Sequence, residues 1–131
     1  MTVDTFDPGA LGNPMDAAAL SDLCAFAREF AGDTIALSEL EVARFAGLAT
    51  HADWSEQAQQ IEDEATLAGL IRVFTLGEMS YPSWTAGERS PVVVLVKELK
   101  RRGAYDVATT RWIKANTTNR FLPHGSLMDR L

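Results

Sequence analysis

The stretch from residue 67 to residue 76 is almost entirely apolar and contains a single charge, Arg72. Its large apolar side chains are Leu67, Leu70, Ile71, Val73, Phe74 and Leu76. At helical spacing these side chains point in nearly every direction, so the helix has almost no polar face. The run is also shorter than the roughly 18–20 residues that a membrane span needs. The sequence therefore predicts a central helix that other elements surround, and no membrane span.

Other segments show the three-to-four spacing of apolar residues that is typical of amphipathic helices. Together with the central run they predict an all-α fold, a compact bundle of about five helices at residues 15–31, 38–49, 53–76, 90–103 and 107–115. The fourth helix is the best delimited, because Ser90 and Pro91 suit a helix start and Gly103 suits the position after a helix end. The run from Val92 to Val96 also has β-propensity, but its place between Pro91 and Gly103 favours a helix.

The chain of 131 residues has the size of one domain. Residues 1–14 contain two prolines, two glycines and no periodicity, which predicts a flexible N-terminal arm before a helical domain at residues 15–131. The segment from Gly77 to Arg89 is rich in helix-breaking and turn-forming residues, and it predicts a loop of about a dozen residues. Loops of that length often carry function.

The charges are unevenly distributed along the chain. The net charge is −6, but residues 1–64 hold 13 acids and 2 bases (−11), whereas residues 65–131 hold 5 acids and 10 bases (+5). A chain with this negative total does not attract nucleic acid in general. Its basic half still permits a local site for an anion or an acidic partner. Alternatively, this half docks onto the acidic half of its own chain or of a second copy.

Few residues suit catalysis or metal binding. Cys24 is the only cysteine, so there is no internal disulfide and no pair of thiols for zinc, which suits a reducing, bacterial-type cytoplasm. His51 and His124 are the only histidines, and no metal, nucleotide or nucleophile motif accompanies them. Several acids precede the first base, Arg28, which argues against a secretory signal. We expect no metal, no cofactor and a cytoplasmic location.

Two segments contain the residue types of a binding surface. Tyr81 and Trp84 place large amphipathic rings in the predicted loop, although both rings have the alternative of folding back over the core. The C-terminal segment interleaves bases with rings and amides, a mixture that suits an anion or an acidic partner. Its predicted binding residues are Arg111, Trp112, Lys114, Asn119, Arg120, Phe121 and His124. An alternative is that Phe121 and Leu122 only fasten this segment to the bundle.

The sequence thus predicts a non-enzymatic binding protein, an adaptor or a regulatory domain, whose partner is another protein or a second copy of the chain. A second hypothesis is the binding of nucleic acid or a phosphorylated ligand through six bases: Lys100, Arg101, Arg102, Arg111, Lys114 and Arg120. A third is a small enzyme, which needs His51 or His124 in a closed pocket beside a carboxylate.

Overall fold

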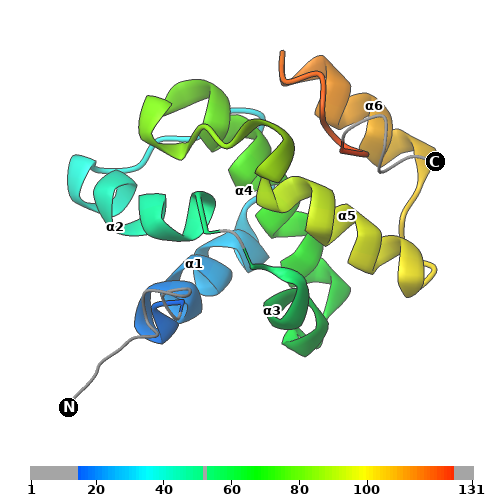
Figure 1. Cartoon of the computed structure of the whole chain (residues 1–131), viewed down its shortest axis with the longest axis horizontal. Helices are drawn as coiled ribbons and strands as arrows, with labels where there is room; N and C mark the ends of the chain where they lie inside the picture. The colour runs from blue at the N-terminus through cyan, green and yellow to red at the C-terminus, as the bar shows by residue number, and fades with distance from the viewer. Residues whose placement is uncertain (1–14, 52, 126–131) are drawn as a thin grey trace.

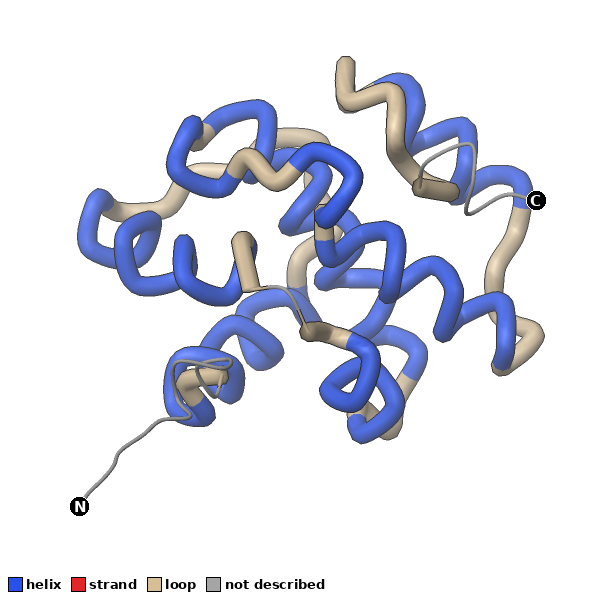
Figure 2. Tube along the Cα trace, in the orientation of Figure 1, coloured by secondary structure: helices blue, strands red, loops and turns tan. Residues whose placement is uncertain are grey.

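The protein is described by a computed structural model that covers residues 15–51 and 53–125. Within these ranges the fold is all-α and contains no strand, which confirms the predicted fold class (Figure 1). Its six α-helices are α1 (Ala17–Glu29), α2 (Glu39–Ala49), α3 (Ser55–Gln60), α4 (Glu64–Ser80), α5 (Pro91–Arg101) and α6 (Val107–Ala115). Two short 3-10 turns, Pro82–Trp84 and Gly87–Arg89, join α4 to α5, as Figure 2 shows. The predicted N-terminal arm lies outside the described residues.

The central helix is α4, as the apolar run predicts. From residue 66 to residue 78 every side chain of α4 is buried except those of Ala68 and Arg72. Helices α1 and α5 make the most extensive contacts with it. Each large apolar side chain that is fully buried there contributes about 1.5–3 kcal/mol relative to an exposed one. None of the helices in the described ranges is long and apolar enough to cross a membrane.

Two glycines of α4 allow close contacts with neighbouring elements. A Cβ atom on Gly69 would lie 1.9 Å from the carbonyl oxygen of Ala27, so α1 packs directly against the backbone of α4. A Cβ atom on Gly77 would lie 2.2 Å from Cζ3 of Trp84. The prediction that Gly77 begins a loop is therefore wrong. The helix continues to Ser80, and Gly77 provides room for the indole ring.

The predicted third helix, residues 53–76, is in fact two helices. The chain leaves helical geometry between Gln60 and Glu64, where Asp63 caps the start of α4 by accepting hydrogen bonds from the backbone and hydroxyl of Thr66. No side chain caps the start of α3. Trp54 occupies the cap position without a side-chain hydrogen bond to the helix, because its indole is a donor and cannot accept from the free amides. The buried indole donates to the Leu48 carbonyl.

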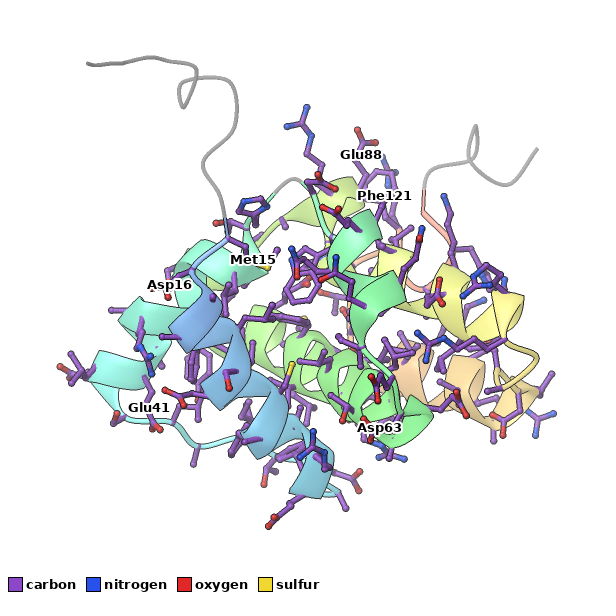
Figure 3. The ribbon with its side chains drawn as sticks, turned by 90° about the horizontal axis from the view of Figure 1, so that it is seen from below. Met15, Asp16, Glu41, Asp63, Glu88 and Phe121 are labelled. Carbon is purple, nitrogen blue, oxygen red and sulfur yellow. The ribbon has the colours of Figure 1, made fainter. Side chains whose placement is uncertain are left out.

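Side chains that accept hydrogen bonds from free backbone amides delimit most of the helices. The capping residues are Asp16 for α1, Ser38 for α2, Asp63 for α4, Ser90 for α5 and Asp106 for α6. In α2, Glu41 completes a capping box by accepting from the Ser38 backbone. Figure 3 shows Asp16, Glu41 and Asp63 at the starts of their helices. The residues from Val92 to Val96 are helical within α5, which settles the strand alternative.

Candidate functional site

The two rings of the predicted binding loop face inward. The side chain of Trp84 is 0% exposed, and its indole nitrogen donates to the carbonyl of Val42 at 2.9 Å. The half-buried Tyr81 accepts a hydrogen bond at its hydroxyl from the Leu37 backbone, also at 2.9 Å. Both rings therefore fasten the end of α4 to α2 and to the segment before it. This corrects the prediction for Trp84, because a buried indole whose N–H has a partner belongs to the core.

Three of the six bases assigned to anion binding have partners within the chain. Arg102 is only 13% exposed, and its guanidinium donates to Glu98 and to the backbone carbonyls that end α3. Arg101 also donates to Glu98, and these two guanidiniums lower the pKa of that carboxyl to about 2. Lys100 lies 3.0 Å from Nδ1 of His124. These contacts leave the bases of α6 as the stronger candidates for a partner.

The cationic surface of this region lies on α6, at the edge of the molecule far from α2 (Figure 1). Val107 is 63% exposed, and Arg111 and Lys114 follow it at helical spacing, so the three form one outer face. Among the described residues, Arg111 and Lys114 have no ion pair and no hydrogen bond through their side chains. Only Ile113 of this helix is fully buried. We call Val107, Arg111 and Lys114 the outer face of α6.

The inner side of α6 carries Trp112, which contacts two other parts of the chain. Its indole nitrogen donates to a carboxylate oxygen of Asp33 at 2.9 Å, and the Arg72 guanidinium carbon lies 4.8 Å from its ring centroid. A second contact joins Arg102 to Glu64 at 3.5 Å. The basic half of the chain therefore docks in part onto the acidic half, as one of the two interpretations of the charge pattern predicts.

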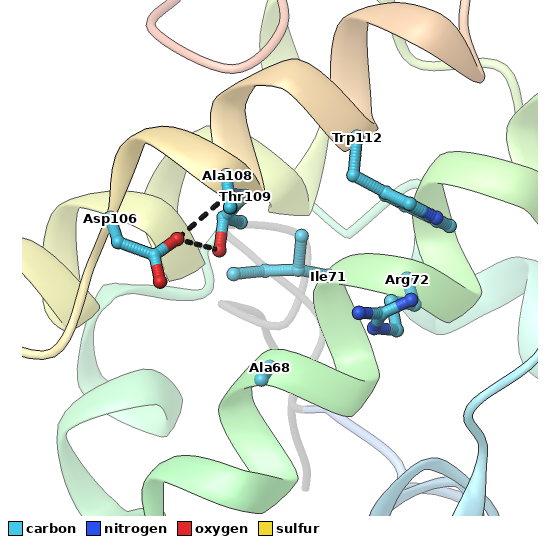
Figure 4. Close-up of a pocket in the computed structure, with 7 residues that line it drawn as sticks. All are labelled: Ala68, Ile71, Arg72, Asp106, Ala108, Thr109 and Trp112. Carbon is cyan, nitrogen blue, oxygen red and sulfur yellow. Dashed lines mark hydrogen bonds between the residues drawn. The ribbon is translucent and has the colours of Figure 1, made fainter.

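A pocket of about 330 Å³ lies between α4 and α6 (Figure 4). Arg72 and Ile71 line it from α4, Thr109 and Trp112 line it from α6, and the capping residue Asp106 lies at its rim. Its size is at the lower end of the range for small-molecule sites, about 300–1,000 Å³. Sequence reasoning singled out Trp112 but missed Arg72 and Asp106, because only the packing of the two helices brings them together.

The segment after α6 packs onto the bundle. Asn119 donates to the Gly87 carbonyl at 3.0 Å and accepts from the Phe121 backbone. The guanidinium of Arg120 lies over the ring of Phe121, with its carbon 5.3 Å from the ring centroid. Leu122 is buried in the core. The interpretation of this segment as a clip is confirmed for Leu122, and Asn119 adds hydrogen bonds that hold the segment in place.

Glu78 is a buried carboxyl group that sequence reasoning placed in a loop. It is 8% exposed, accepts a hydrogen bond from the Ser90 hydroxyl, and is also hydrogen bonded to Asn119. Burial raises the pKa of this carboxyl to about 7, and the two hydrogen bonds oppose that shift. The cluster joins the end of α4 to the start of α5 and to the C-terminal segment.

The free energy of unfolding should depend on pH in a way that reveals the titration of Glu78. A folded-state pKa above the ordinary value of 4.5 means that the folded protein binds the proton more tightly, so the contribution to stability is complete below pH 4.5 and is lost as the pH rises through 7. We expect Glu78→Gln to remove this loss, which makes the variant more stable than the wild type at pH 8 by about 2–3 kcal/mol. Urea unfolding at pH 5 and pH 8 measures the difference.

The control for this experiment is Glu88→Gln, since Glu88 is an exposed carboxylate on the nearby 3-10 turn. The wild type and the control variant should lose stability in parallel between pH 5 and pH 8. If Glu78→Gln follows the same curve as the other two proteins, the buried carboxyl does not titrate in this range.

The two histidines and the single cysteine are the residues that the sequence analysis considers for catalysis or metal binding. Neither His51 nor His124 lines the pocket between α4 and α6. No group of three or more histidine, cysteine or acidic side chains that could hold a metal ion occurs within residues 15–51 and 53–125. Burial raises the pKa of the Cys24 thiol, which disfavours its reactive thiolate form. In comparisons with protein-family models, curated proteins and solved structures, nothing matches the chain.

Proposed function

We propose that this protein is a non-enzymatic binding protein whose outer face of α6 engages an acidic surface of a partner protein. The observation that carries the proposal is the pair of exposed cations, Arg111 and Lys114, which have no ion pair among the described residues. In contrast, Arg28, Arg44 and Arg102 each have a carboxylate partner in the chain. Arg89 and Lys97 are also exposed and have no ion pair among the described residues, but they lie on different elements and form no common face. Val107 adds an exposed apolar contact beside Arg111 and Lys114. The single cysteine is compatible with action in a reducing cytoplasm.

Charge and composition favour a protein partner over nucleic acid. Two cations beside an exposed valine resemble the mixed apolar and basic surface of a protein interface, in which arginine is enriched. A nucleic-acid site of useful affinity needs more phosphate contacts than two cations can make, because each contact adds to the electrostatic attraction. The net charge of −6 opposes that attraction. The acidic half of a second copy is one surface of the required kind, so self-association belongs to the same proposal.

Titration with a synthetic peptide that alternates glutamate and leucine tests the proposal, with backbone NMR shifts as the readout. We expect the largest shifts on α6, and we expect R111E/K114E to weaken binding about tenfold, because reversing two surface charges removes a pairing of about 1 kcal/mol and adds repulsion. The matched control is R89E/K97E, which changes the net charge equally at two exposed bases outside α6. Its effect should be clearly smaller.

Two further measurements decide between partners. Sedimentation velocity at low and high salt shows whether a second copy is the partner, since an electrostatic dimer dissociates in salt. An oligonucleotide that binds more tightly than a peptide of equal charge would overturn the choice of a protein partner. Equal losses in R111E/K114E and R89E/K97E would show that the outer face of α6 has no special role.

A further inference from the structure

The pocket between α4 and α6 is distinct from the outer face of α6, because it lies on the inner side of the same helix. Its volume depends on two small residues, Ala68 on α4 and Ala108 on α6, which line it where longer side chains would fill it. Ile71 supplies an apolar surface between the two helices (Figure 4). The pocket is therefore open to a small aliphatic group, with polar residues around it.

Arg72 is the cation of the pocket. Its side chain is half-buried, and its guanidinium stacks on the ring of Trp112. That ring is held in place by its own hydrogen bond to Asp33. A guanidinium stays charged at all relevant pH values and carries five N–H donors, yet none of them has an acceptor among the described residues. A partly buried arginine with fixed orientation and unused donors suits the carboxylate of a ligand.

Asp106 is the anion of the pocket. One of its carboxylate oxygens accepts hydrogen bonds from the backbone and hydroxyl of Thr109, both at 2.8 Å. These hydrogen bonds lower the pKa of the carboxyl and keep it ionised. The second oxygen has no hydrogen-bond partner in the part of the chain that the structure describes. Figure 4 shows Asp106 and Arg72 on either side of Ile71, so the pocket has opposite charges at its two ends.

We propose that this pocket binds a small aliphatic zwitterion, with its carboxylate on Arg72 and its ammonium group on Asp106. The aliphatic part of the ligand lies on Ile71 and fills the space beside Ala68. Linear ω-amino acids, in which an aliphatic chain separates the carboxylate from the ammonium group, are the class of compound that has this arrangement of charges. A ligand of this kind also joins α4 to α6, and α6 buries only one side chain completely on its own.

The length of the ligand is tested with linear ω-amino acids from β-alanine to 6-aminohexanoate and with L-leucine. Two-dimensional NMR is a suitable readout, because Trp112 lines the pocket and the signal of its indole N–H reports changes around the ring. We expect one member of the set to bind best. The analogues that lack one charge, hexanoate and hexylamine, should bind at least about tenfold more weakly, because each leaves one charged side chain of the pocket without a partner.

Two variants connect binding to the pocket. Ala68→Leu fills the space between the helices, and Arg72→Gln removes the cation while it keeps a polar side chain. Both should weaken binding of the best probe at least about tenfold. Ala115→Leu is the matched control, since Ala115 is exposed on α6 and does not line the pocket, and this variant should bind the probe normally.

The proposal is overturned if no zwitterion binds, if hexanoate binds as tightly as the best zwitterion, or if Ala68→Leu binds like the wild type. R111E/K114E should leave this binding intact, so the two proposals fail separately.

Discussion

Gly69→Ala is expected to destabilise the protein by about 3 kcal/mol or more. The added methyl group would lie 1.9 Å from the Ala27 carbonyl oxygen. Neither group can rotate away, because the α4 backbone fixes the position of the methyl carbon and the oxygen belongs to the α1 backbone. The helices α1 and α4 must therefore separate, and the separation opens gaps around Leu23 and Leu70, both of which are fully buried. Overpacking a core costs about 1–3 kcal/mol when side chains can adjust, and more when backbone must move. The free energy of unfolding in urea, followed by circular dichroism, measures the loss.

The control is the same substitution in α2. A Cβ atom on Gly47 would meet no other atom within 4 Å, and this exposed glycine lies inside a helix. Alanine in such a position is more stable than glycine by about 0.5–1 kcal/mol, so Gly47→Ala should stabilise the protein. The two substitutions thus have effects of opposite sign. A Gly69→Ala protein of wild-type stability would mean that α1 does not pack against α4 at this distance.

Sequence patterns were sufficient for most of the helices and for several of their caps, because these depend on residues close together in the chain. Ser38, Ser90 and Asp106 accept hydrogen bonds from amides two or three positions later, and such pairs are visible in the sequence. The apolar run that forms α4 is equally local, since its spacing alone shows that no face suits water. The all-α fold follows from these features without any knowledge of tertiary contacts.

The errors concern residues whose roles depend on distant partners. Gly77 resembles a helix breaker in the sequence, but it faces Trp84 across a turn, and that contact keeps it inside α4. The break before Asp63 interrupts an apolar pattern that runs on through Ile61, so periodicity alone favours one long helix. Capping by Asp63 and packing on neighbouring helices outweigh that pattern.

The candidate site depends even more strongly on contacts between distant residues, which the sequence does not reveal. A list of bases contains no information about which of them already have partners, so Arg102 and Arg111 are equivalent in the sequence. In the structure Arg102 is directed at α3, whereas Arg111 points outward on α6. In the sequence, Arg72 is only the charge that interrupts an apolar run. Its position opposite Asp106 becomes visible only when α4 and α6 are packed together.

Arg102→Met is the second substitution with a large expected effect, a loss of about 3–5 kcal/mol. Arg102 joins three elements, because its guanidinium binds Glu98 on its own helix and the carbonyls of Ala58 and Ile61 at the end of α3. Methionine retains the length of the aliphatic stem but donates no hydrogen bond. The substitution leaves the carboxylate of Glu98, which is 6% exposed, with Arg101 as its remaining cation, and it leaves the last carbonyls of α3 with fewer donors.

Arg101→Met is the matched control, since Arg101 is 65% exposed and binds only Glu98. Its loss should be much smaller, because Arg102 still pairs with the buried carboxylate and the guanidinium that is lost is itself exposed to water. The acid limb of the stability curve adds a second readout. The pKa of Glu98 is lowered to about 2, so its contribution is present above the ordinary value of 4.5 and is lost as the pH falls towards 2. Both arginine variants should flatten this acid limb, because the hydrogen bond from Arg101 is the largest cause of the lowered pKa and the hydrogen bond from Arg102 is the next. Both variants should leave the limb that Glu78 controls, between pH 5 and pH 8, unchanged. If both arginine variants lose the same stability, then α3 is held by its apolar contacts and the hydrogen bonds of Arg102 are dispensable.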